Sequence, residues 1–183
     1  MSYICIYIEL FQFRFSLVSK IIIRMKYFIS FLTLTLFSMP ILAQVENYEP
    51  AHEGWLVTVE EAYQESQNTG KPIMAYFTGS DWCPPCRRFS AAVINQPQFN
   101  DWAKENVVLL ELDNPRRKQV PDQIRQQNQS MREAFNVTGV PTIWVFNLNM
   151  NESNGQFEID PLGRTGFVGS YDQFTSTIEE LLN

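Results

Sequence analysis

The sequence predicts an α/β fold, in which a central mixed β-sheet carries helices on both faces. Two short apolar runs, 72–77 and 107–112, have the composition of buried strands, and a helical pattern separates them. A third run, 142–146, is β-branched and aromatic. Residues 147–155 read as the turn of a hairpin, and 171–182 as a closing helix with one apolar face. Strand, helix and strand, then a hairpin and a helix, give this layered arrangement.

The helices are predicted from capping signals and from apolar residues at helical spacing. Thr58 and Glu61 have the spacing of a capping box, which opens a helix, and Gly70 ends it. The remaining helices before the hairpin are expected at 84–95, 97–105 and 121–135. Because a helix lies in each connection between the first strands, both faces of the sheet are covered.

The N-terminal residues have the character of an export leader. Met25 and Lys26 precede an uncharged apolar stretch, 27–42, which ends beside the small residue Ala43. We expect translation to begin at Met25, with residues 1–24 an upstream extension of the gene model. Removal of the leader would make the protein periplasmic or secreted. A signal that stays uncleaved and tethers the chain to the membrane is the alternative.

Residues 1–43 are therefore assigned to the extension and signal peptide, 44–54 to a linker and 55–183 to one domain. Four of the 14 Lys and Arg residues and one of the 20 Asp and Glu residues precede residue 44, so the remainder has a net charge of −9. This acidic balance argues against nucleic acid or an anionic membrane as a partner. Residues 44–183 retain two cysteines, Cys83 and Cys86, which is fewer than in secreted domains that rely on disulfides for stability.

The candidate site is the motif Trp82-Cys83-Pro84-Pro85-Cys86, at a strand-to-helix turn. Cys83 at a helix N-terminus would have its thiolate favoured by the helix dipole and by free N–H groups. The thiolate is the nucleophile of disulfide exchange, so Cys83 is the predicted nucleophile and Cys86, one turn inside the helix, the resolving thiol. Pro84 suits the first helical position, where a missing N–H costs nothing.

Zinc binding and a purely structural disulfide are the two other interpretations of this cysteine pair. A zinc site needs about four ligands, and the chain offers only three cysteines and one histidine, His52. No metal is therefore expected. A purely structural disulfide across so small a loop removes little chain entropy and stabilises weakly. Redox chemistry is the favoured interpretation.

Three stretches of the chain, 76–89, 107–115 and 137–142, together resemble thioredoxin-fold thiol–disulfide oxidoreductases. More narrowly, the chain is similar to secreted bacterial thioredoxin-like proteins that have a W-C-x-x-C motif and an N-terminal signal. The resemblance covers 55–182. It implies a thioredoxin-like three-layer fold and a redox-active Cys83–Cys86 disulfide in place of a cofactor.

The resemblance also implies residues that bind substrate. Val140-Pro141 should be a cis peptide that offers the Val140 backbone to a substrate chain as an extended partner. Trp82 should cover the Cys83 sulfur and supply an apolar docking surface. An ordinary trans proline and a tryptophan packed on the core are the alternatives.

The chain departs from thioredoxins at the buried acid that they keep in the strand before the active site. The corresponding strand here, 73–77, has no carboxylate. The nearest acids in the sequence are Asp81, which we expect to be exposed, and Glu111, which belongs to another strand. The sequence leaves open which group handles the proton when the disulfide opens.

The predicted function is a thiol–disulfide oxidoreductase of the cell envelope. Its partners would be protein thiols and disulfides, with a membrane electron-donor protein upstream. Pro84 and Pro85 supply no charge or histidine to stabilise a thiolate strongly, which favours a reductant. A disulfide oxidase or isomerase, and a non-catalytic binding module, are the alternatives.

A basic run, Arg116-Arg117-Lys118, interrupts the acidic domain. It lies in a connection that is longer and more polar than the one in the smallest thioredoxins. We interpret it as a solvated helix face. A rim that receives an acidic partner is the alternative.

Overall fold

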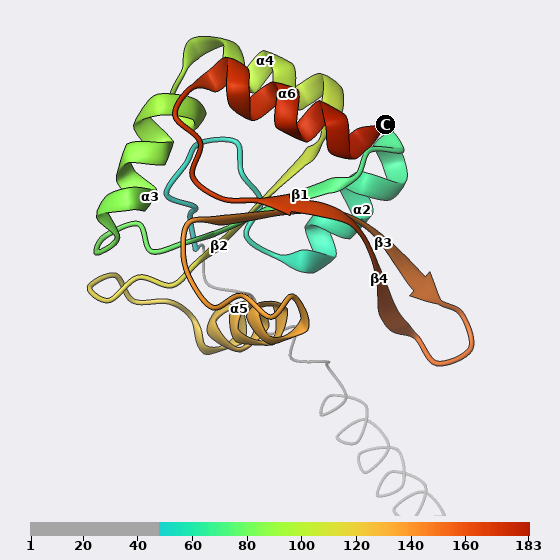
Figure 1. The fold of residues 1–183 in the computed structure, drawn as a ribbon. Helices are drawn as coiled ribbons and strands as arrows, with labels where there is room; N and C mark the ends of the chain where they lie inside the picture. Colours follow the sequence, from blue (N-terminus) through green and yellow to red (C-terminus); the bar gives the residue numbers. More distant parts are fainter. Residues whose placement is uncertain (1–47) are drawn as a thin grey trace, which may run out of the picture. The chain divides into compact units, whose positions relative to one another are not determined.

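The computed structural model describes residues 48–183. The predicted Met25 start and the signal segment lie outside these residues and stay predictions. The described residues fold as the sequence predicts, with one sheet between two layers of helices (Figure 1).

The sheet has four strands in the order β2-β1-β3-β4. In chain order they are β1 (Ile73–Thr78), β2 (Val108–Asp113), β3 (Thr142–Asn151) and β4 (Gln156–Thr165). β1 pairs with β2 in parallel, whereas β1 with β3 and β3 with β4 are antiparallel. The mixed sheet is therefore confirmed, and β1, which leads to the cysteine motif, is a central strand.

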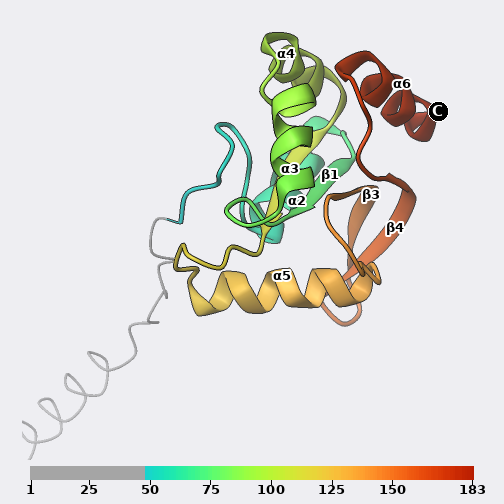
Figure 2. The ribbon, with the colours of Figure 1, turned by 60° about the vertical axis from the view of Figure 1, so that its left-hand side comes forward.

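Helices cover both faces of the sheet, as Figure 2 shows. Side chains of one face share a core cluster with α3 (Pro84–Phe89), the π-helical η1 (Ser90–Ile94), α4 (Pro97–Asn106) and α6 (Tyr171–Leu182). The opposite face packs against α2 (Val59–Thr69) and α5 (Asp122–Ala134). Successive residues of β1 alternate between the clusters, so Met74 and Tyr76 face α3 while Ala75 and Phe77 face α5.

Capping chemistry sets the bounds of α2 as expected. Thr58 is its N-cap and accepts a hydrogen bond from the Glu61 N–H at 3.2 Å. Gly70 ends the helix in the left-handed conformation, with φ of 70°. The helix therefore stops where β1 must enter the sheet.

The hairpin is longer than predicted. β3 continues to Asn151 and β4 begins at Gln156, so only 152–155 of the turn expected over 147–155 lie outside the strands. The polar residues among 147–151 favour a turn by composition, but they pair across the two strands, and the Asn151 side chain donates to Glu158 at 2.5 Å. Pro161 stands at a register shift of the outer strand β4, where a ladder N–H is not needed.

Two other expectations need correction. The helix predicted over 84–95 changes at Ser90 from α-helix to a π-helical turn. The basic run 116–118 is not a helix face, because α5 begins only at Asp122. It lies instead in the loop that follows β2.

Candidate active site

The two cysteines of the motif are joined in a disulfide at the start of α3. Cys83 is the N-cap residue, and its Sγ accepts a hydrogen bond from the Cys86 N–H at 3.2 Å. Pro84 takes the first helical position, as predicted. Both cysteines are almost buried, with 3% of Cys83 and 1% of Cys86 exposed. The backbone N–H at the helix start therefore points to the Cys83 sulfur, where it would stabilise a thiolate.

The turn before β3 lies against this sulfur. Val140-Pro141 is a cis peptide, as the resemblance implied. The Val140 carbonyl oxygen is 3.7 Å from Cys83 Sγ, although the two residues are 57 positions apart. The fold thus brings Val140 and Pro141 to Cys83; their role in binding substrate stays a prediction.

Trp82 joins the active-site turn to the loop after β2. Its Nε1–H donates to the Asn114 carbonyl at 2.8 Å, and the Arg116 guanidinium lies 4.2 Å from the ring centroid. Gly79 makes room for the indole, since a Cβ at that position would collide with it. The role of Trp82 in docking substrate stays a prediction.

Asp81 is half-buried rather than exposed as expected, and its carboxylate holds the same loop. Its carboxylate accepts from the Arg116 N–H at 3.0 Å and from the Arg117 N–H at 2.6 Å. These backbone donors lower the pKa of Asp81 below its usual value, the Arg116 bond most of all. Asp81 therefore acts on the loop rather than on the buried sulfur.

Tyr76 lies in β1, the strand in which thioredoxins keep a buried acid and this chain has none. It faces the core cluster that α3 shares. Its side chain is fully buried, and its hydroxyl donates to the Cys86 carbonyl at 3.3 Å. Burial raises the pKa of Tyr76. Across the sheet Tyr76 is paired with Glu111 of β2, so a carboxylate does lie beneath the site, one strand away.

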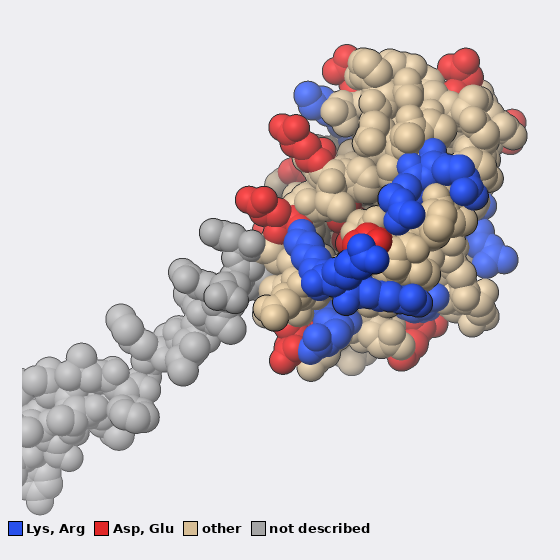
Figure 3. Space-filling model, turned by 90° about the vertical axis from the view of Figure 1, so that its left-hand side faces the viewer, with Lys and Arg blue, Asp and Glu red and all other residues tan. Residues whose placement is uncertain are grey.

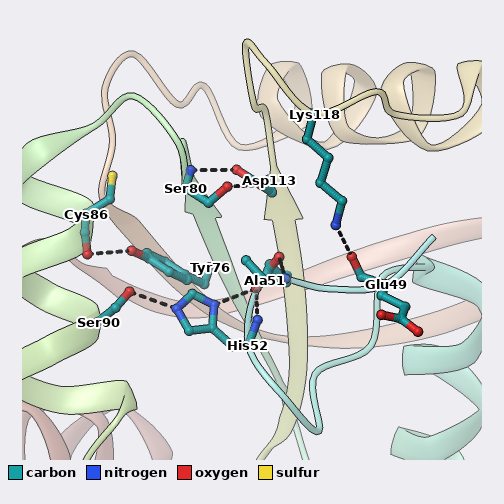
Figure 4. A network of polar contacts seen from close by, with 10 residues as sticks. Glu49, Ala51, His52, Tyr76, Ser80, Cys86, Ser90, Asp113 and Lys118 are labelled. Atoms are coloured by element: carbon teal, nitrogen blue, oxygen red, sulfur yellow. Dashed lines mark hydrogen bonds and ion pairs between the residues drawn. The ribbon is translucent and has the colours of Figure 1, made fainter.

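Glu111 is held by the segment that precedes α2, whose residues Ala51 and His52 are drawn in Figure 4. It is 1% exposed and accepts from the Ala51 N–H at 2.7 Å and the His52 N–H at 3.2 Å. His52 Nδ1 is 2.5 Å from Glu111 Oε2, and His52 Nε2 is 2.8 Å from Ser90 Oγ. His52 thus connects Glu111 to η1, one turn beyond Cys86.

Sequence reasoning missed the role of His52, because it placed this residue in a linker. A signal was present. Glu111 is the one charge within the apolar run 107–112, and a carboxylate in a buried strand needs a partner. His52 is the only histidine of the chain.

A second buried acid, Asp113, fixes the turn before the motif. It accepts from the Ser80 N–H at 2.9 Å and from the Ser80 hydroxyl at 2.5 Å (Figure 4). Burial raises the pKa of Asp113 above its usual value. The turn is therefore tied to β2 at Ser80 and to the loop after β2 at Asp81 and Trp82.

Within residues 48–183, no group of three or more His, Cys, Asp or Glu side chains is arranged to hold a metal ion. None of the helices in this range has the length and apolar composition needed to cross a membrane. The groups at the site that can undergo redox chemistry are the two cysteine sulfurs.

Comparisons with known proteins agree with this geometry. A family model described as thioredoxin-like matches residues 54–147. The solved structure of a DsbH oxidoreductase superposes with a TM-score of 0.61 and 28% identity, over 81% of this chain and 96% of that one. The thioredoxin-like fold is thereby confirmed.

Curated relatives match over shorter segments. The disulfide bond reductase DsbH of Chlamydia pneumoniae is 34% identical over 83 residues, 45% of this chain and 50% of that protein. The thioredoxin-related protein DsbJ of the same organism is 29% identical over 57% of this chain and 30% of DsbJ. The thiol:disulfide interchange protein DsbD of Haemophilus influenzae strain PittGG is 31% identical over 56% of this chain and 15% of DsbD. The chain spans half or less of the length of these relatives.

Proposed function

The chain belongs to the thioredoxin-like family, and from this we propose that it is a thiol–disulfide oxidoreductase that exchanges disulfides with protein substrates. One observation carries the proposal. The Cys83 sulfur lies at the N-cap of α3, within reach of a backbone N–H, and beside the Val140 carbonyl. This arrangement favours a thiolate at Cys83 and places an extended backbone edge next to it.

The exchange runs in two steps from the reduced enzyme. The Cys83 thiolate attacks one sulfur of the substrate disulfide. A mixed disulfide forms between Cys83 and that sulfur as the substrate S–S bond breaks, and the other substrate sulfur leaves as a thiolate. Cys86 then loses its proton and attacks the Cys83 sulfur, which releases the second substrate thiolate and forms the Cys83–Cys86 disulfide. The substrate gains two electrons that the enzyme loses, so a thiol donor must reduce the enzyme again.

The resolving role falls to Cys86 because its position is fixed from within. Its carbonyl accepts from the Tyr76 hydroxyl and from the Ser90 N–H, and both cysteines are buried. A thiol whose backbone is held in this way stays beside Cys83 for the second step.

We propose the direction of reduction, and a place in the cell envelope. Pro84 and Pro85 add no charge that would make the reduced form unusually stable. A relative named a disulfide bond reductase supports the direction. The predicted leader over 27–42 supports the location. A membrane-bound thiol donor would supply the electrons.

Trapping tests the roles of the two cysteines. A Cys86→Ser variant should accumulate mixed disulfides with an oxidised protein such as insulin, because the second step is lost. The matched Cys83→Ser variant should accumulate none. Faster alkylation of Cys86 than of Cys83 in the reduced wild type would reverse the assignment.

The reduction potential tests the direction. A reductant should have a value of about −230 mV or lower, in the range of glutaredoxins and thioredoxin. A value near about −120 mV, as in the oxidant DsbA, would contradict the proposal. A disulfide that resists reduction altogether, with no alkylation of Cys83 near neutral pH, would indicate a binding module.

A further inference from the structure

Positive charge is concentrated next to the active site of this acidic domain. Residues 44–183 contain ten Lys and Arg residues. Five of them line one hollow of about 750 Å³. We call it the cationic hollow, and its basic residues are Arg116, Arg117, Lys118, Arg125 and Arg132. Figure 3 looks onto this side of the molecule, where Lys and Arg side chains gather and most acidic side chains lie toward the margin.

The cationic hollow adjoins the cysteine motif through Trp82. Asn114 and Arg116 belong to its wall, and both contact Trp82, the residue before Cys83. The loop that carries three of the cations is held in place, because Asp81 accepts from the N–H groups of Arg116 and Arg117. A chain bound at Cys83 could therefore continue into the hollow without a rearrangement of this loop.

The acids of the wall, and Asp81 beside it, offset only part of this charge. Asp113 is buried and hydrogen-bonded to Ser80, and Asp122 pairs with Arg125. Among the described residues, no ion pair joins the other four basic side chains of the hollow to an acid. Lys118 donates to the Glu49 carbonyl, which neutralises no charge.

We propose that the cationic hollow binds an acidic segment of the protein substrate, adjacent in the substrate to the disulfide that Cys83 attacks. The inference rests on the proposed function and names the substrate class for it. Guanidinium groups suit carboxylates because they can donate two parallel hydrogen bonds. Because the domain carries a net negative charge, its surface outside the hollow would repel a long polyanion or an anionic membrane. A short acidic segment, which contacts the hollow alone, is therefore the favoured partner.

A binding experiment tests the hollow without any redox step. The oxidised protein is titrated with a short cysteine-free peptide that contains a run of Asp and Glu, and with its Asn and Gln analogue. We expect the acidic peptide to bind at least about 10-fold more tightly, and added salt to reduce the difference. Equal affinity for the two peptides would overturn the proposal.

Charge removal locates the binding site. An Arg117→Gln, Lys118→Gln, Arg132→Gln triple variant should lose most of the preference for the acidic peptide. The control Lys71→Gln, Lys104→Gln, Arg164→Gln triple variant removes the same number of cations, all outside the hollow, and should keep it. If both variants lose the preference equally, the effect is one of net charge and the proposal fails. Tighter binding of a short single-stranded oligonucleotide than of the peptide would likewise overturn the choice of partner.

A kinetic experiment separates this inference from the proposed function. Reduction of a small neutral disulfide by the wild type reports exchange at Cys83 alone, and its absence would sink the proposed function. Given that activity, a disulfide peptide flanked by acidic residues should react about 10-fold faster than one flanked by basic residues. Equal rates for the two peptides would leave the oxidoreductase in place and remove the acidic-substrate proposal.

Discussion

The two sulfurs of the disulfide lie in different surroundings. Around Cys83, the structure is made of turns and loops: the motif itself, the turn at Val140 and the loop that carries Arg116. Around Cys86, it is made of sheet residues and a polar network, with Tyr76, Glu111 and His52 beneath the helix start. The difference matches the two steps of exchange, since one sulfur must meet varied partners and the other must stay in place.

The contacts differ in kind as well. On the Cys83 side, side chains bond to backbone groups, as Trp82 does to Asn114 and Asp81 does to Arg116. On the Cys86 side, bonds to backbone groups are joined by a chain of side chains that bond to one another, from Glu111 through His52 to Ser90. Because a backbone group is supplied by any residue, the outer loop can change its side chains and keep its place. A substitution in the inner network leaves a buried partner without its bond.

The largest effect is expected on the Cys86 side, from His52→Ala, which breaks the network of Glu111, His52 and Ser90. Glu111 would stay buried and lose its closest partner, which costs about 3 kcal/mol or more of unfolding free energy. Denaturant unfolding measures the change. His52→Gln, which can still donate to Glu111, should lose less, and equal losses in the two variants would show that the hydrogen bond to Glu111 contributes little.

The Cys83 side is tested by Gly79→Ala. The added methyl group would collide with the Trp82 indole and force it from its seat against Asn114 and Arg116. We expect a loss of about 1–3 kcal/mol and a change in tryptophan fluorescence. Gly169→Ala is the control, because its added Cβ would make only an ordinary contact. A Gly79→Ala protein with unchanged fluorescence and stability would argue against this seat.

Tyr76→Phe removes the link between β1 and Cys86 and keeps the aromatic packing. The Cys86 carbonyl would retain the Ser90 N–H as a donor. The expected loss of unfolding free energy is therefore that of one net hydrogen bond, about 1 kcal/mol. A loss as large as that of His52→Ala would mean that Tyr76 holds the inner network together, rather than joining it at one end.

The smallest effects concern two acids whose pKa values shift in opposite directions. Burial raises the pKa of Asp113 in the folded protein, so the native state binds its proton more tightly than the unfolded chain does. The stability that Asp113 contributes is fully present below its ordinary pKa of 3.8. It is lost as the pH rises from there through the higher pKa of the folded protein. The pKa of Asp81 is lowered, so its contribution is present at neutral pH and is lost as the pH falls.

Urea unfolding at a series of pH values compares Asp113→Asn with Asp81→Asn. Relative to the wild type, Asp113→Asn should gain stability as the pH rises above about 4, because a buried charge has been removed. Asp81→Asn should instead lose stability relative to the wild type as the pH rises toward about 4, since its bonds to the loop depend on the charge, and the difference should then stay constant at higher pH. Parallel profiles in the two variants would contradict the opposed shifts.

Much of this molecule follows from local patterns in the sequence. The run 72–77 is apolar throughout because β1 is buried on both faces, and the capping residues Thr58 and Gly70 bound α2 whatever it packs against. The motif at Cys83 and Cys86 predicted both the position at the helix start and the disulfide. These features depend on neighbours a few residues away, which a sequence displays directly.

Only the tertiary structure decided which distant groups meet. Glu111 reaches the site because β2 pairs in parallel with β1 in a register that sets it beside Tyr76, and His52 reaches Glu111 from 59 positions away. The turn signal predicts the hairpin but not its length, because the polar residues among 147–151 become strand only through their partners across β3 and β4. The loop at Arg116 becomes part of the active-site wall through Asp81. Sequence fixes local conformation through steric and capping preferences, whereas long-range pairs are chosen by the packing of the whole sheet and its helices.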